Sequence, residues 1–171
     1  KEAFDTTKTK KEVILDLWNG ELSSSSDYGR FTLEVSGTGP AESGADTFRI
    51  SLQSGTDGFF NEAIGSTSVT TSSFGNWKHY AFSFVSAPAG VTSRLYVDGD
   101  LDNEKNLGSV ALGSIGGLFN GYIGALRTSP SSSNGTHTQS QLQYAGKLSA
   151  SLDEFRFWKT RRTSEQIYNN W

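Results

Sequence analysis

The chain has 171 residues, of which 12% are aromatic, with 19 Gly, only 3 Pro and a high content of Ser and Thr. This composition predicts one domain of short strands joined by polar turns. The absence of Cys excludes disulfides and thiolate zinc sites. Residues 13–158 hold 8 Lys/Arg against 14 Asp/Glu, and this acidic balance excludes nucleic-acid binding, which needs a basic surface.

The first part of the chain contains segments that alternate as half-buried strands do. Residues 1–12 are charged and aperiodic, and we interpret them as a tail or a remnant edge strand before a single domain over 13–171. Val13, Leu15 and Leu17 are expected on one face of the first strand. The predicted strands of this part, separated by Gly-, Ser- or Asp-containing turns, are 13–19, 30–35, 47–52 and 59–64. Their spacing is typical of a sandwich or barrel.

The second part continues the pattern over 76–85, 94–97 with the residues after Gly99, 121–126 and 147–158. The apolar, Gly-flanked segment 121–126 is predicted to be a buried strand. In 147–158 the apolar residues change from even to odd positions between Leu152 and Phe155. A strict period of two does not produce that change, so a bulge or bend is predicted at Asp153–Glu154.

Two features near the C-terminus differ from the strands. Residues 128–143 form a long loop rich in hydroxyls and amides, either a recognition surface or a flexible linker. Thr163 and Gln166 have the spacing of a capping box, which predicts a short helix docked through Ile167. We interpret this helix as an element that sets orientation rather than as a binding element.

The stretch RLYVDGDLDNEKN (94–106) has four carboxylates at every second position, which suggests either a calcium loop or a hairpin. A calcium loop of EF-hand type needs Gly at its sixth position and Glu at its twelfth. Counted from Asp98, those positions hold Asn103 and Ser109. The stretch is therefore predicted to be a hairpin with Asp98–Gly99 in its turn. Its acids are expected on a solvated face that discourages sheet pairing, with Leu101 on the other face.

Four segments, in this order, carry a family resemblance: GNWKHYAFSF, RLYVDG, YIGALR, and KLSASLDEFRFW with TSEQI. The set resembles the laminin G-like domains of the concanavalin A-like lectin superfamily, firmly over 74–168 and by strand spacing over 13–66. Pentraxins share the superfamily, and their last two strands match this register best. The resemblance implies an all-β jelly-roll sandwich of two antiparallel sheets with a short C-terminal helix. It also implies binding to sugars, proteins or lipids, often with calcium.

Some relatives in the superfamily hydrolyse glucans with carboxylates on one strand in an E-x-D-x-x-E pattern. This chain has no such pattern, and the adjacent Asp153 and Glu154 point to opposite faces of a regular strand. We therefore expect no catalysis, with Glu154 paired to a surface base. His79 is interpreted as structural and His137 as an exposed loop residue. No G-x-S-x-G elbow or phosphate-binding loop is present in the sequence.

A pentraxin-type double calcium site is not expected, because the place of its ligands reads Arg127–Ser131 without a carboxylate. A single structural calcium at the rim is compatible with the sequence, with Asp27 or Asp57 as a ligand. The alternative interpretation of both Asp27 and Asp57 is a solvated residue in a turn.

Sugar binding needs exposed aromatic rings flanked by amides and carboxylates. The aromatic residues on predicted turns and loops include Phe60 and Phe119. The predicted ligand-binding residues are Tyr28, Phe59, Tyr122, Asn134, His137, Gln141 and Tyr144.

The sequence therefore predicts a non-catalytic recognition module that binds a glycan or a protein, without membrane insertion. Lys at position 1 suggests a piece of a longer extracellular, cell-surface or virion protein. An assembly module without a small ligand and a divergent glycoside hydrolase are the alternatives.

Overall fold

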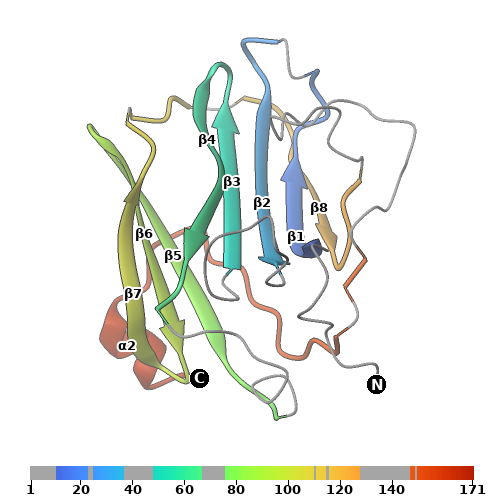
Figure 1. The fold of residues 1–171 in the computed structure, drawn as a ribbon. Coiled ribbons are helices and arrows are strands. Elements are labelled where there is room, and N and C mark those ends of the chain that lie inside the picture. The colour runs from blue at the N-terminus through green and yellow to red at the C-terminus, as the bar shows by residue number, and fades with distance from the viewer. Residues whose placement is uncertain are drawn as a thin grey trace.

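The computed structural model describes residues 11–22, 25–36, 48–66, 76–109, 111–114, 116–127, 147–148 and 150–171. They form two antiparallel sheets that lie face to face, with a short helix near the C-terminus (Figure 1). The strand orders are β4-β3-β2-β1-β8 in the larger sheet and β5-β6-β7 in the smaller one. This architecture confirms the predicted all-β sandwich with a C-terminal helix.

The larger sheet consists of β1 (Lys11–Trp18), β2 (Gly29–Ser36), β3 (Phe48–Ser54), β4 (Asp57–Ile64) and β8 (Asn120–Ile123). The smaller sheet consists of β5 (Tyr80–Ala87), β6 (Gly90–Val97) and β7 (Asp100–Leu107), and the helix α2 spans Ser164–Tyr168. Because β1 begins at Lys11, the last two residues of the predicted tail 1–12 belong to this strand.

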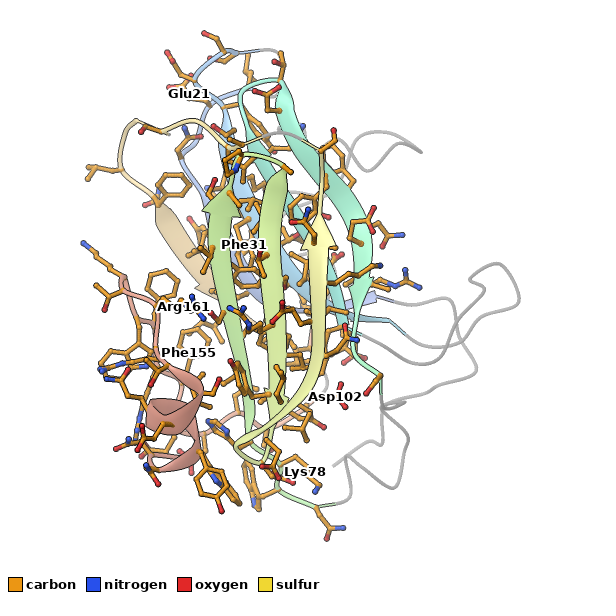
Figure 2. All side chains as sticks on the ribbon, turned by 90° about the vertical axis from the view of Figure 1, so that its left-hand side faces the viewer. Glu21, Phe31, Lys78, Asp102, Phe155 and Arg161 are labelled. Atoms are coloured by element: carbon orange, nitrogen blue, oxygen red, sulfur yellow. The ribbon has the colours of Figure 1, made fainter. Side chains whose placement is uncertain are left out.

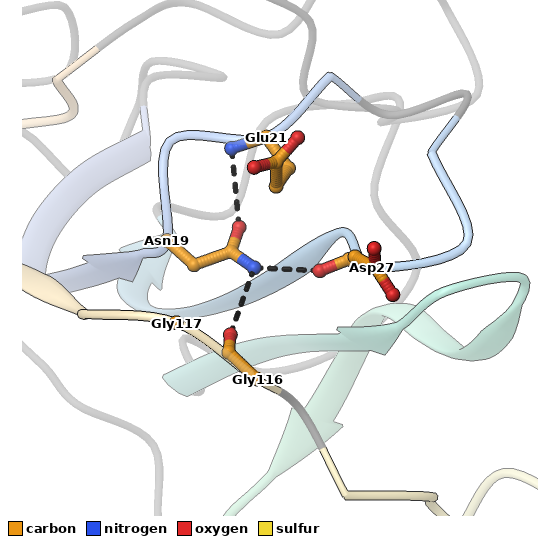
Figure 3. Close-up of a pocket in the computed structure, with 5 residues that line it drawn as sticks. All are labelled: Asn19, Glu21, Asp27, Gly116 and Gly117. Atoms are coloured by element: carbon orange, nitrogen blue, oxygen red, sulfur yellow. Dashed lines mark hydrogen bonds between the residues drawn. The ribbon is translucent and has the colours of Figure 1, made fainter.

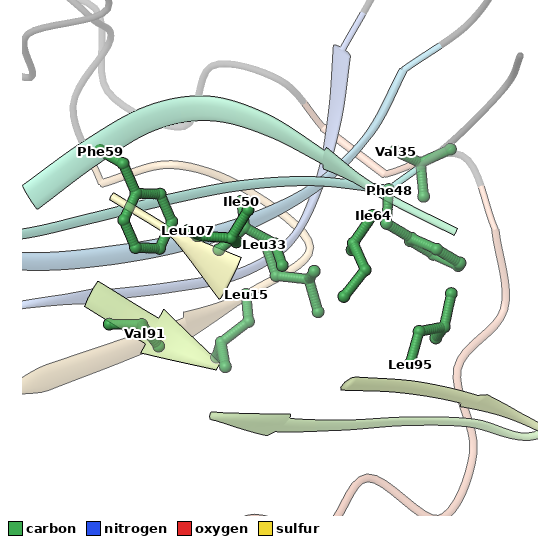
Figure 4. Close-up of a cluster of buried hydrophobic side chains, with 10 residues drawn as sticks. All are labelled: Leu15, Leu33, Val35, Phe48, Ile50, Phe59, Ile64, Val91, Leu95 and Leu107. Carbon is green, nitrogen blue, oxygen red and sulfur yellow. The ribbon is translucent and has the colours of Figure 1, made fainter. Parts of the chain in front are cut away.

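The core lies between the sheets and is built from alternate positions of their inner faces (Figure 4). Leu33 pairs with Ile50 and Val35 with Phe48, so these side chains share a face. The ring of Phe48 packs edge to face against the ring of Phe82, which belongs to the smaller sheet. The ring centroids are 5.0 Å apart. Such a pair contributes about 0.5–1.5 kcal/mol beyond burial. The buried cluster comprises Leu15, Leu33, Val35, Phe48, Ile50, Phe59, Ile64, Val91, Leu95 and Leu107.

A bulge in β1 changes one predicted face. Val13 pairs with Glu34 and Leu15 with Leu33, and the register shifts between them. The extra residue turns Val13 to the face opposite Leu15, so the expectation that both share a face with Leu17 is wrong.

The predicted hairpin is confirmed. The turn between β6 and β7 is formed by Asp98 (φ 50°) and Gly99 (φ 87°), the two positive φ values that a type I′ turn requires. The carboxylate of Asp98 accepts hydrogen bonds from Lys78 Nζ and, at 3.0 Å, from the backbone N–H of His79. Burial raises the pKa of Asp98, but these hydrogen bonds outweigh it and hold the pKa below its usual value.

The acidic strand β7 departs from the prediction. The register shifts between Leu95 and Tyr96, which pair with Asn103 and Leu101, so alternation along β7 is broken and Leu101 is exposed. Asp102 accepts hydrogen bonds from the backbone N–H and hydroxyl of Ser66, both at 2.8 Å. The strand therefore joins the smaller sheet to the end of β4, and its carboxylates do not all face solvent.

Two predicted strands also need correction. Of residues 147–148 and 150–158, none lies in a strand, and Glu154 has φ 51°. The predicted bend is present at this residue. An extended strand cannot continue through its left-handed backbone. The segment 121–126 was expected to be buried, yet β8 pairs only with β1 among the described strands, and Ile123 is exposed.

The predicted helix is confirmed with its cap. Gln166 N–H donates to Thr163 Oγ1 at 3.2 Å, and Thr163 N–H donates to Gln166 Oε1 at 3.1 Å, which completes a capping box. Ile167 is buried, and the hydroxyls of Ser164 and Tyr96 lie 3.0 Å apart. The helix is thus fixed to the smaller sheet at both its start and its apolar side.

Candidate functional site

An open pocket of about 290 Å³ lies at one end of the sandwich, where the β1–β2 and β7–β8 connections meet (Figure 3). We call it the rim pocket; it is lined by Asn19, Glu21, Asp27, Gly116 and Gly117. Asn19 directly follows β1, and Asp27 lies two residues before β2. Neighbouring antiparallel strands therefore bring the two side chains to the same sheet end.

Asn19 organises this pocket with both ends of its amide. Its Nδ2 donates to the backbone oxygens of Asp27 at 2.6 Å and Gly116 at 3.5 Å. Its Oδ1 accepts from the backbone N–H groups of Glu21 at 3.2 Å and Gly29 at 3.1 Å. One side chain thus holds both loops together, and an amide is the side chain that offers donors and acceptors at once.

The carboxylates of Glu21 and Asp27 are exposed at one wall of the pocket. The other wall is formed by Gly116 and Gly117, which have no side chains. A Cβ added at Gly116 would meet nothing within 4 Å, and one at Gly117 would lie 4.0 Å from Asn19 Cβ. A ligand can therefore approach the backbone of this wall closely. Two carboxylates opposite accessible peptide groups suit a ligand that carries several hydroxyls.

A buried ion pair connects β1 and β2 beside the pocket. Arg30 donates to both carboxylate oxygens of Asp16, at 2.8 and 2.7 Å, and the two side chains are 1% and 0% exposed. The guanidinium also lies 5.2 Å from the ring centre of Trp18, whose Nε1 donates to the backbone oxygen of Glu21 at 3.0 Å. This chain of contacts connects the sheet to the pocket loop.

Tyr28 belongs to the same buried network. It is fully buried, and burial raises the pKa of its hydroxyl to about 12, while the charge of Arg30 and a hydrogen bond with it oppose the rise. The prediction of Tyr28 as an exposed stacking ring is therefore wrong, because the side chain is fully buried and hydrogen-bonded to Arg30.

A laminin G-type family model, described as the concanavalin A-like lectin/glucanases superfamily, matches residues 5–168. The chain belongs to this family. A solved structure similar to this concanavalin A-like domain is that of an S-layer domain-containing protein from Clostridium thermocellum. It shares 24% identity over 99% of this chain and 67% of that chain, with a TM-score of 0.42. No curated protein matches significantly. Among the described residues of the domain, no helix has the length and apolar character to cross a membrane.

The other predicted ligand residues lie in different environments. Phe59 is buried in the core, so its prediction as an exposed ring is wrong. Tyr122 is half-buried on β8, with the guanidinium carbon of Arg127 5.9 Å from its ring centre. Phe60 is half-buried and Phe119 is exposed. The remaining predicted residues lie outside the described part of the chain: Asn134, His137, Gln141 and Tyr144, with the loop 128–143.

The two predicted metal ligands lie in different loops at the same end of the domain. Asp27 lines the rim pocket, whereas Asp57 is the first residue of β4. The turn before Asp57 is joined to the β1–β2 connection by a hydrogen bond from the backbone N–H of Gly55 to the backbone oxygen of Tyr28. Calcium takes six to eight oxygen ligands. In the described ranges, no group of three or more acidic or His side chains could hold an ion. Backbone carbonyl oxygens also bind calcium, so the single calcium with Asp27 or Asp57 as a ligand stays a prediction.

The carboxyl pair of the predicted last strand lies on the surface. Asp153 and Glu154 are both exposed, and Glu154 pairs with Arg156 at 2.7 Å, as expected for a surface acid. Asp153 accepts a hydrogen bond from the backbone N–H of Glu154 at 2.8 Å. His79 is half-buried, and burial holds its pKa below the usual value.

Sequence reasoning missed most of the rim pocket. Asn19–Gly20 directly after an apolar run is a turn signal that could have identified the pocket loop. Asp16 and Arg30 stand at polar positions of two consecutive strands, and their opposite charges could have indicated a pair. No signal in the sequence places Gly116 and Gly117 against Asn19, because that contact joins residues about a hundred positions apart.

Proposed function

We propose that this domain is a non-catalytic recognition module that binds a glycan at the rim pocket, outside the cell or on a cell or virion surface. The observation that carries the proposal is the pairing of two exposed carboxylates, Glu21 and Asp27, with the open wall at Gly116 and Gly117. A carboxylate accepts hydrogen bonds from adjacent sugar hydroxyls, and the accessible backbone supplies further partners.

The architecture of the pocket supports this role. Binding sites on a sandwich gather in loops held by a rigid scaffold. Here Asn19 fixes both loops, and Phe119, two residues after Gly117, is an exposed ring. An aromatic ring next to polar groups is the surface that a sugar needs, since one sugar face is apolar and its edge is polar.

The test is a glycan array probed with the intact chain, followed by titration of any glycan that binds. Asp27→Asn and Glu21→Gln should each weaken binding about tenfold or more, because hydrogen bonds to a charged group contribute about 1.5–3 kcal/mol. The matched control is Asp57→Asn, an exposed acid at the same end that does not line the pocket. An array without binding, or affinities unchanged in both variants, would contradict the proposal and favour an assembly module.

A second candidate surface for glycan binding begins at Arg127, the residue before the loop 128–143. Asp16 accepts a hydrogen bond from the backbone N–H of Arg127 at 2.9 Å, which fixes the residue before loop 128–143 beside Tyr122. Tyr122→Ala and Tyr144→Ala test this surface on the same array. Loss of binding in these variants, with Asp27→Asn unaffected, would move the glycan site from the rim pocket to this loop.

Calcium dependence is a separate arm of the same experiment. The described residues contain no group of three or more acidic or His side chains that could hold an ion, so we expect equal binding in calcium and in chelator, and no rise of the melting temperature with calcium. A calcium-dependent rise would identify further ligands in the chain.

A further inference from the structure

Exposed aromatic rings gather at the end of the sandwich opposite the rim pocket. Trp77, Tyr168 and Trp171 are 69%, 58% and 58% exposed, although large rings usually bury most of their surface. Figures 1 and 2 place this end of the molecule, with Lys78, α2 and the C-terminus, away from Glu21 at the other end. We call these three rings, with His79 and the turn at Asp98–Gly99, the aromatic platform.

Trp171 is held in place by contacts on both sides. Its ring stacks on His79, with centroids 6.1 Å apart and planes at 30°. A Cβ on Gly99 would lie only 2.4 Å from Trp171 Nε1, so the ring occupies space that only glycine leaves free. Trp171 therefore has a defined position, and little freedom is lost when a ligand covers it.

The helix α2 supplies the rest of the support. Its capping box, the buried side chain of Ile167 and the contact between Ser164 and Tyr96 fix it to the smaller sheet. Tyr168 is the last residue of this fixed helix, and Trp171 follows three residues later. Trp77 lies two residues before His79, on which Trp171 stacks.

The charges at the platform cancel in pairs. Lys78 and Asp98 form one ion pair, and Arg156 and Glu154 form another at 2.7 Å. Burial lowers the pKa of His79, the charge of Asp98 raises it, and the charge of Arg156 lowers it by a smaller amount. The pKa is therefore below its usual value, which favours the neutral imidazole. The two ion pairs carry no net charge, and the exposed acids Asp100 and Glu165 beside them disfavour an anionic polymer.

We propose that the aromatic platform is a second ligand site, which stacks the pyranose rings of a neutral polysaccharide. Aromatic rings attract the polarised C–H groups of a sugar face, while Asp98 and Lys78 contact hydroxyls at its edge. A protein interface fits less well, because it buries about 1,200–2,000 Å² with a core depleted of charge, whereas here an ion pair lies among the rings. With a glycan site at the rim pocket, the domain is bivalent and bridges two chains.

Affinity electrophoresis of the full chain in gels that contain β-glucan, xylan or galactomannan tests this inference, with titration of the matching oligosaccharide. Trp171→Ala and Tyr168→Ala should each weaken binding about fivefold or more, from the size of one aromatic contact. Trp171→Phe should keep part of the affinity. The control is Trp158→Ala, which removes a ring that is 52% exposed and covered by Arg162 at 3.7 Å.

The outcomes separate this site from the rim pocket. Loss in Trp171→Ala with no effect of Asp27→Asn supports the aromatic platform and contradicts the rim pocket. The reverse result, or no retardation in any of the three gels, overturns the platform. Self-association that disappears in Trp171→Ala, without polysaccharide binding, would identify a contact between copies of the chain and also overturn it.

Discussion

At the scale of single residues, the ion pair of Asp16 and Arg30 is the most consequential contact of the larger sheet. Both side chains are buried, so each charge depends on the other for compensation. A buried pair of this kind contributes little net stability compared with apolar residues, but removing one partner leaves an uncompensated charge. Its position beside Trp18 also links stability to the shape of the rim pocket.

We predict that Asp16→Asn or Arg30→Met lowers the free energy of unfolding by about 3–5 kcal/mol, measured by urea denaturation. The double variant Asp16→Asn/Arg30→Met should lose less than the sum of the two single changes. Glu154→Gln is the control, because its pair with Arg156 is exposed and should contribute no more than about 1 kcal/mol. Equal effects of Asp16→Asn and Glu154→Gln would show that burial of the pair is unimportant.

Tyr28 predicts a specific dependence on alkaline pH. Its pKa is about 12 in the folded state and about 10 when unfolded, so the folded state retains the proton more strongly. The contribution of protonated Tyr28 to the free energy of unfolding is complete below pH 10 and is lost as the pH rises from 10 toward 12. Burial also raises the pKa of Tyr80, so absorbance titration near 295 nm should show late-ionising tyrosine absorbance that is reduced, but not abolished, in Tyr28→Phe. An unchanged late component in the variant would contradict the assignment to Tyr28.

At the scale of elements, the β6–β7 hairpin and α2 act as a unit. The turn presents Asp98 to Lys78 and His79 on one side, while Gly99 leaves room for Trp171 on the other. The sequence predicted the turn and the helix separately, because each has a local signal. Their contact depends on the tertiary fold, so no local signal could show it.

We predict that Gly99→Ala displaces Trp171 and lowers the free energy of unfolding by more than Gly20→Ala does. Both glycines have nearly the same φ, +87° and +86°, so both substitutions carry the left-handed cost of about 1–2 kcal/mol. Only Gly99 has a neighbour inside contact distance, whereas a Cβ on Gly20 meets nothing within 4 Å. Urea denaturation measures the difference, and tryptophan fluorescence reports the displaced ring. Identical spectra and stabilities for both variants would contradict the close contact.

At the scale of the whole molecule, alternation in the sequence predicted the sandwich because alternate apolar residues of β2, β3 and β5 pack in the core between the sheets. It failed where the period is broken. The bulges in β1 and β7 turned Val13 and Leu101 away from their expected faces. The left-handed backbone at Glu154 lies within the segment where a strand was expected, and such conformations have no apolar pattern.

The candidate sites were harder to predict than the fold. Tyr28 and Phe59 were predicted to be exposed because they stand at predicted turns. Both are buried, and they fill space between elements that are distant in sequence. Asp27 was identified as a loop acid, whereas its neighbours Asn19 and Glu21 were not. Loop residues have no periodicity, so only their contacts in the fold indicate which of them meet.

The seam between β7 and β4 gives the last prediction, because it joins the two sheets at one side of the sandwich. Asp102 receives two hydrogen bonds from Ser66, just after β4, and Lys105 Nζ donates to the oxygen of Ala63 at 3.2 Å. Asp102→Ala should lower the free energy of unfolding by about 1–2 kcal/mol and speed amide exchange at the end of β4. Asp100→Ala, an exposed change on the same strand, should stay within about 0.5 kcal/mol. If exchange in β4 is unchanged while stability falls, the loss comes from β7 alone, and the seam does not hold the two sheets together.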